Sequence, residues 1–187
     1  MVPSAREALL NAALAALDEQ PWRTVRMVDV AALAGVSRQS LYNEFGGKDG
    51  LARALLGEAA DGYLAGVERA LDPDVDTDAG TGRGPAAVAL WTVRAARTNA
   101  LVKALLTGFW GERLPRSAAS PTPAELLGLA RDRAVAALAG GQPPEAAAEL
   151  AVRCETVLRL ALSYVMVPAE GCTAPLIMEA ARPREAC

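Results

Sequence analysis

The sequence predicts an all-α protein, and two observations carry this prediction. The chain has 187 residues, among them 41 alanines and 25 leucines but only 25 β-branched residues. Alanine and leucine lose little side-chain freedom in a helix, whereas β-branched residues are restricted there. Apolar residues also recur at three- and four-residue steps along most of the chain, which is the period of an amphipathic helix. We therefore expect helices throughout, in one large domain or in a small module joined to a larger one.

The first predicted helix begins after Ser4. This serine is a suitable N-cap, and Glu7 completes a capping box three residues later. Leu10 and Leu14 then lie four residues apart on one face, and Pro21 ends the helix because proline cannot continue the hydrogen-bond ladder.

Two short helices and a long one are expected next. The short apolar segments 27–34 and 38–45 are joined by a turn that contains Gly35. The glycine pair 46–47 ends the second segment, and a long helix is expected over 48–71.

The second half of the chain is predicted to be helical as well. Residues 72–84 form an acidic loop rich in Asp and Gly, with a net charge of −3. Residues 111–122 are rich in Pro and Ser and are expected to be irregular. Helices are predicted over 86–97, 99–107, 123–139, 144–167 and 175–181.

The composition excludes many enzyme mechanisms. The chain has no histidine, so an imidazole base, an HExxH zinc site and a histidine-ligated haem are all ruled out. Cys154, Cys172 and Cys187 are odd in number and 18 and 15 residues apart, which argues against a disulfide framework or a structural zinc site. We expect no cofactor, no metal and no catalytic activity. The alternatives are a helical enzyme built on a carboxylate or tyrosine pair and a protein-interaction module without DNA binding.

The sequence also predicts a cytoplasmic protein. Its N-terminus lacks the charged region and apolar run of a signal peptide, and the longest uncharged apolar stretch, 160–169, is about half a membrane span. The net charge is −3, which does not favour a nonspecific nucleic-acid binder or a membrane partner.

Residues 27–46 carry the strongest functional signal, since two short helices joined by a glycine-containing turn are typical of a helix-turn-helix. Gly35 can adopt the left-handed conformation that ends the first helix, Val36 can fill the angle between the helices, and Ser37 can cap the second. One face of the second helix carries side chains suited to groove edges and phosphates, namely Arg38, Gln39, Ser40, Tyr42 and Asn43.

These residues resemble the TetR family of bacterial transcription regulators. The resemblance rests on Ala-Gly-Val-Ser at 34–37, Leu-Tyr-Asn-Glu-Phe at 41–45, and Gly47 followed by Lys48, and it covers about residues 4–60. Two positions depart from the family pattern. Arg26 stands where a capping Thr or Ser is usual, so the cap is expected to be lost or moved to Thr24, and Gly47 replaces a serine.

The resemblance implies a homodimer that represses transcription at a palindromic operator on double-stranded DNA and responds to a small, largely apolar effector. It places a DNA-binding domain at 1–64 and an effector-binding and dimerisation domain at 65–187, with the dimer formed by the helices at 144–167 and 175–181. Bases or the adjoining backbone would be approached by Ser37, Arg38, Gln39, Ser40 and Asn43, and phosphates would be held by Thr24, Arg26, Tyr42 and Lys48.

Two further features leave alternatives open. Glycines at 57, 62 and 66 interrupt the long helix that joins the two domains. Gly62 and Gly66, four apart on one face, let a neighbouring helix pack closely, or the glycines ease a bend when effector binds. The few aromatic residues fill the core or line an effector pocket, and Cys154 is expected to be a buried apolar residue. The candidate pocket set is Trp91, Phe109, Trp110, Cys154, Leu158 and Tyr164.

Overall fold

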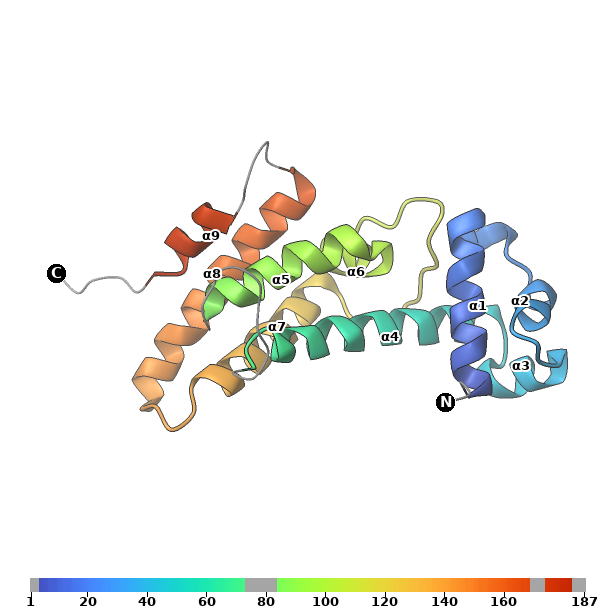
Figure 1. Cartoon of the computed structure of the whole chain (residues 1–187), viewed down its shortest axis with the longest axis horizontal. Helices are drawn as coiled ribbons and strands as arrows, with labels where there is room; N and C mark the ends of the chain where they lie inside the picture. Colours follow the sequence, from blue (N-terminus) through green and yellow to red (C-terminus); the bar gives the residue numbers. More distant parts are fainter. Residues whose placement is uncertain (1–3, 73–83, 169–173, 183–187) are drawn as a thin grey trace. The chain divides into compact units, whose positions relative to one another are not determined.

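The computed structural model describes residues 4–72, 84–168 and 174–182, and within these ranges it contains helices and no strand, as predicted (Figure 1). The helix boundaries agree with the predicted ones to within a few residues. The acidic loop predicted at 72–84 lies almost entirely outside the described residues. The elements are α1 (Ala5–Glu19), the 3-10 helix η1 (Trp22–Thr24), α2 (Met27–Leu33), α3 (Arg38–Phe45), α4 (Lys48–Arg69), α5 (Pro85–Thr98), α6 (Ala100–Thr107), α7 (Pro123–Leu138), α8 (Pro144–Met166) and α9 (Ala174–Ala180).

The chain divides into two compact units. The head unit contains residues 1–59 and the segment 109–120, and the body unit contains residues 60–108 and 121–187. Helix α4 starts in the head and ends in the body. The predicted boundary at residue 64 concerns where DNA binding and effector binding separate, and it stays a prediction.

The head is built around α1, α2 and α3, which pack on one another (Figure 1). The predicted capping box is confirmed, since the Ser4 hydroxyl accepts from the Glu7 amide and the Glu7 carboxylate accepts from the Ser4 amide. Leu9, Val30 and Leu41 are fully buried and supply a core to which each of the three helices contributes. Each of these helices is short for an isolated helix in water, so its stability depends on burial of this shared apolar surface.

The body packs α5 and α7 against the long helix α8, with α6 against α5 and α7, and α9 against α5 and α8. Its core is mostly Ala, Leu and Val. Thr92 is the exception among the described residues, as a fully buried polar side chain. The Thr92 hydroxyl donates to the Val88 carbonyl at 2.8 Å and lies 3.0 Å from the Tyr63 hydroxyl, so both buried hydroxyls have partners.

The glycines of α4 differ in their surroundings. Gly66 is buried, and a Cβ there would collide with the indole ring of Trp91, whereas a Cβ on Gly62 would have no neighbour within 4 Å. Trp91 is fixed in place because its indole N–H donates to the Tyr63 carbonyl at 3.0 Å. The close-packing interpretation therefore holds for Gly66 and not for Gly62, while a role in bending stays a prediction.

The described helices include none that is long and apolar enough to cross a membrane. Helix η1 was not expected from the sequence, because three residues are too few to show a period.

Candidate nucleic-acid interface

The turn between α2 and α3 has the geometry that a helix-turn-helix requires. Gly35 adopts φ +69°, a left-handed conformation that favours glycine, and the Val36 amide bonds back to the Ala31 carbonyl at 3.0 Å. Ser37 caps α3, because its hydroxyl accepts from the Ser40 amide at 3.0 Å. The predicted roles of Gly35 and Ser37 in the fold are thus confirmed.

Helix α3 is two-sided. Leu41 is fully buried and Phe45 nearly so, which fixes the helix on the head core and turns its other side outward. We call this outer side the α3 face. It consists of six exposed side chains, all of them predicted site residues: Ser37, Arg38, Gln39, Ser40, Tyr42 and Asn43.

Side chains of the α3 face order one another. The hydroxyl oxygens of Ser37 and Ser40 lie 2.8 Å apart, and the Gln39 amide nitrogen donates to the Asn43 amide oxygen at 2.8 Å. This leaves the Gln39 oxygen, the second Gln39 N–H and the Asn43 amino group unused within the pair, so the pair still offers an acceptor and three N–H donors.

The charges near α3 leave its face positive. The Arg38 guanidinium lies 6.0 Å from the Tyr42 ring centre and has no carboxylate partner within the described part of the chain. The one carboxylate of α3, Glu44, is bound by Arg6 of α1 at 2.7 Å, and the same guanidinium lies 5.0 Å from the Phe45 ring centre. Arg6 therefore neutralises the charge that would most directly repel a phosphate. Sequence reasoning missed this pair because its members are 38 residues apart.

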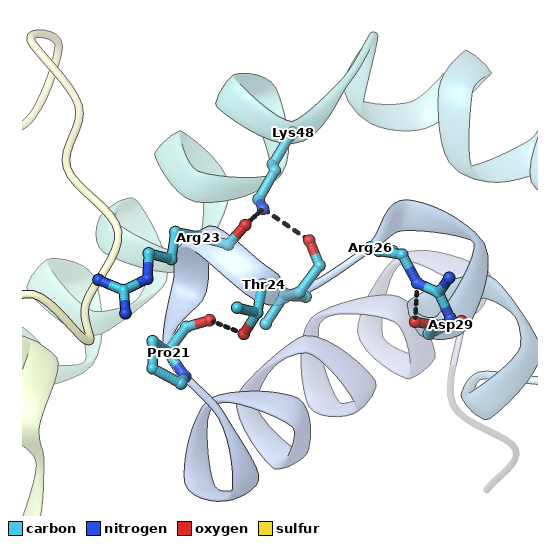
Figure 2. A network of polar contacts seen from close by, with 7 residues as sticks. Pro21, Arg23, Thr24, Arg26, Asp29 and Lys48 are labelled. Atoms are coloured by element: carbon cyan, nitrogen blue, oxygen red, sulfur yellow. Dashed lines mark hydrogen bonds and ion pairs between the residues drawn. The ribbon is translucent and has the colours of Figure 1, made fainter.

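Arg26 and Thr24 are exposed, and neither caps α2 (Figure 2). The Arg26 guanidinium binds the Asp29 carboxylate through two nitrogens, at 2.8 and 3.1 Å, and this contact raises the Arg26 pKa. The Thr24 hydroxyl donates to the Pro21 carbonyl at 2.7 Å. The cap lost at Arg26 has thus not moved to Thr24.

Lys48 points inward toward the chain that precedes α2 (Figure 2). Its ammonium donates to the carbonyls of Arg23 at 3.1 Å and Val25 at 2.6 Å, and it lies 5.3 Å from the Trp22 ring centre. Partial burial lowers the Lys48 pKa, with Asp49 acting in the opposite direction. Two of its three N–H groups are therefore occupied, and a phosphate contact would have to use the third.

Comparison with known proteins decides the family. The family model described as "Bacterial regulatory proteins, tetR family" matches residues 9–55, which contain the helix-turn-helix. The model described as "Bacterial Tetracyclin repressor, C-terminal domain" matches residues 82–181, more than half of the chain. The chain belongs to the TetR family of bacterial transcription regulators.

Individual relatives agree with this assignment. The HTH-type transcriptional regulator AlkX of Mycobacterium tuberculosis (strain ATCC 25618 / H37Rv) is 39% identical over 70 residues, which cover 37% of this chain and 33% of the relative. The chain thus matches about a third of that relative's length.

Two solved structures share the fold. The TetR family repressor AlkX from Dietzia sp. strain DQ12-45-1b, implicated in biodegradation of n-alkanes, is 20% identical with a TM-score of 0.52, covering 93% of this chain and 92% of that one. A tetR-family transcriptional regulator from Streptomyces coelicolor is 22% identical with a TM-score of 0.59, covering 97% and 78%.

One part of this TetR-family protein was not foreseen as belonging to the head. In the segment 109–120, the Arg113 carbonyl accepts from the Trp22 amide at 2.7 Å, and the Arg113 guanidinium donates to the Asp18 carbonyl at 3.4 Å. Glu112 binds Arg23 at 3.1 Å. The segment joins α6 to α7 but bonds to the head, and its irregular sequence contains no periodic signal that could have shown this.

The six candidate pocket residues are dispersed. Trp91, Cys154, Leu158 and Tyr164 belong to the body, where Cys154 and Leu158 are fully buried and burial raises the Cys154 pKa to about 11. Phe109 and Trp110 belong to the head, and Phe109 is 70% exposed. None of the six lines the cavity of about 580 Å³ that the body contains between α6, α7 and α8.

Proposed function

We propose that this TetR-family regulator reads a specific DNA site with α3 in the major groove and represses transcription there. The observation that supports this most directly is the α3 face, whose polar side chains are exposed and whose Arg38 guanidinium is not engaged by a described carboxylate. An arginine can bond two acceptors of guanine, and Gln or Asn can bond adenine in the same bidentate manner. We assign base contacts to Ser37, Arg38, Gln39, Ser40 and Asn43.

Phosphate contacts would surround this reading face. Arg26 and Tyr42 are exposed and can reach backbone oxygens, Arg26 by exchanging its exposed Asp29 partner for a phosphate. Thr24 would have to turn its hydroxyl from the Pro21 carbonyl toward the phosphate, and Lys48 would use its third N–H. These contacts position the protein without reading sequence.

We further propose a homodimer formed by α8 and α9. Both helices carry exposed apolar side chains that a partner would cover, among them Val152 at 67% exposed and Leu176 at 57%. A two-fold axis would present two copies of α3 to a palindromic operator, with half-sites about 34–36 Å apart or a multiple of that distance.

The body would receive a small, largely apolar effector that releases the operator. Its core of Ala, Leu and Val suits an apolar ligand. In this proposal DNA-binding lies in residues 1–64 and effector binding in 65–187, the protein acts in the cytoplasm, and it catalyses no reaction.

The test is binding to DNA that flanks the protein's own gene, measured by fluorescence anisotropy against scrambled duplexes. Wild-type protein should prefer one duplex by at least about 10³-fold, and Arg38→Ala should lose about 1–3 kcal/mol of binding together with sequence preference. Arg53→Ala removes the same charge from α4 and is the matched control, which should retain the preference. Equal binding to flanking and scrambled DNA would refute the proposed function.

A further inference from the structure

The cavity of the body unit is an open groove between the C-terminal end of α6, the first half of α7 and the second half of α8. We call it the α7–α8 groove. Its volume of about 580 Å³ is in the range of small-molecule sites. We propose that it binds an amphipathic carboxylate, with the apolar chain along the groove and the acid group on Arg131 and Arg159.

The groove has apolar walls. Leu106 of α6, Leu127 of α7, and Leu162 and Met166 of α8 line it, together with Pro123 at the start of α7. These side chains offer hydrocarbon contact to a flexible chain, and Met166 can adapt its shape because it is unbranched.

The charged side chains gather at one end of the groove. Arg131 lies farthest along α7 among the lining residues, and Glu155 comes first among those of α8. The two are joined by an ion pair of 3.7 Å, and Arg159 binds Glu155 at 2.6 Å. A ligand that fills the groove lengthwise would therefore have its polar group at this end.

The charge arrangement favours an anion over a cation. Both oxygens of the single lining carboxylate, Glu155, already face a guanidinium, so little acceptor capacity is left for an ammonium group. Two guanidinium groups line the groove. Arg131 is held by Asp132, which does not line the groove, at 2.9 and 2.8 Å. Arg159, in contrast, is 70% exposed and has one terminal nitrogen outside its Glu155 contact, so Arg159 is the more available donor. Arginine offers a planar fork of donors that matches a carboxylate.

The groove lies on a flank of α8 that α9 does not occupy. Glu155, Arg159, Leu162 and Met166 recur at four- and three-residue steps and so share one face of α8. Arg153 points to a different face, where its guanidinium donates to the Ala181 carbonyl that follows α9 at 2.6 Å. A dimer interface on the α9 side of α8 would leave the groove open, whereas one centred on Val152, seven residues before Arg159 on the same side of α8, would approach its charged end.

The position of the groove in the chain suits an effector site. Residues 106–107 and 123–124 line it and directly flank the segment 109–120, which is bonded to the head through Asp18, Trp22 and Arg23. A ligand that shifts the ends of α6 and α7 would pull on this segment. The effector role rests on the proposed function, whereas binding in the groove does not.

The experiment is calorimetric titration of the full chain with three matched probes, decanoate, decan-1-ol and decylamine, below their aggregation concentrations. Decanoate should bind at least about tenfold more tightly than either other probe. In the double variant Arg131→Gln/Arg159→Gln, decanoate affinity should fall by about tenfold or more, with decan-1-ol affinity unchanged. Glu155→Gln should act in the opposite direction and raise decanoate affinity, because it removes the competing carboxylate.

A steric variant tests the location. Gly128 lines the groove, and a Cβ there would have no neighbour within 4 Å, so Gly128→Leu can fill the groove without displacing backbone. It should abolish binding of all probes, and the melting temperature should not fall below that of wild type, because leucine favours a helix more than glycine does. Gly62 is equally open in α4, which makes Gly62→Leu the matched control that keeps binding.

The outcomes separate the two proposals. The groove assignment is overturned if decanoate still binds Gly128→Leu, or if the arginine substitutions do not weaken decanoate binding. It is also overturned if the mass of the protein assembly changes when decanoate is added, because this would show that a second copy of the chain occupies the groove. Arginine-dependent binding by a protein that prefers no DNA sequence would support the groove while refuting the proposed function. Operator release by decanoate in wild type, and its loss in Gly128→Leu, would support both.

Discussion

The Lys48 ammonium lies 2.6 Å from the carbonyl oxygen of Val25, and this contact ties the first residue of α4 to the chain that enters α2. A second bond to the Arg23 carbonyl and the proximity of the Trp22 ring complete the attachment. Lys48 therefore attaches the helix-turn-helix to α4. It has this role in the fold in addition to the phosphate contact proposed for it.

Lys48→Met should consequently destabilise the protein. The methionine keeps the apolar stem but leaves two carbonyls without their charged donor, which should lower the free energy of unfolding by about 1–3 kcal/mol. Urea unfolding followed by tryptophan fluorescence measures this. Arg53→Met makes the same change at an exposed position of α4 and should be nearly neutral. If Lys48 served only to bind a phosphate, stability would be unchanged and only the salt dependence of DNA binding would fall, by about one unit of slope.

Arg6 should influence DNA binding without touching DNA. Arg6→Ala frees the Glu44 carboxylate, which then lies uncompensated on α3 and repels phosphates. We expect operator affinity to fall while stability changes by less than about 1 kcal/mol, because the pair is partly exposed. Adding Glu44→Gln to Arg6→Ala should restore affinity. A double variant as weak as Arg6→Ala would show that Arg6 itself contacts the DNA.

The sequence predicts the elements of this protein better than the contacts between them. Helix α3 has the predicted bounds because local groups set both ends, the Ser37 hydroxyl at one and the left-handed Gly46 at the other. The outward position of the α3 face follows in the same way from the spacing of Leu41 and Phe45.

Contacts between residues that are distant in the sequence could not be predicted from it. The carbonyl partners of Lys48 lie 23 and 25 residues earlier in the chain, and no periodic pattern encodes them. The groove was missed for a related reason. Aromatic residues were expected either to fill the core or to line a pocket. Trp91 packs on Gly66 and bonds to Tyr63, while aliphatic and charged residues line the groove.

The two glycines of α4 make a matched pair for substitution. Gly62→Ala should raise the free energy of unfolding by about 0.5–1 kcal/mol, because alanine favours the helix and nothing lies within 4 Å of the new Cβ. Gly66→Ala should lower it by about 1–3 kcal/mol, because the Cβ must displace the Trp91 ring. Thermal unfolding by circular dichroism distinguishes the signs. A gain in stability from both substitutions would contradict the close packing of Gly66.

Tyr63 should make the stability of the body sensitive to alkaline pH. Burial raises the Tyr63 pKa from 10 to about 12, and the hydrogen bond to Thr92 opposes part of this rise. A tyrosine in the unfolded chain loses its proton near pH 10, while the folded protein retains it. The unfolded state therefore binds fewer protons between pH 10 and 12, and linkage requires that stability falls with pH across this window.

The contribution of Tyr63 is fully present below pH 10 and is lost as pH rises through about 12, a loss of roughly 3 kcal/mol. Tyr63→Phe removes this dependence and also removes the hydrogen bond with Thr92, which should lower stability at pH 7 by about 1 kcal/mol. Wild type should thus be the more stable protein at pH 7 and the less stable one near pH 12. Urea unfolding of both proteins from pH 7 to 12 should show the two curves crossing above pH 10. Parallel curves would mean that the buried hydroxyl ionises as readily in the folded state as in the unfolded chain.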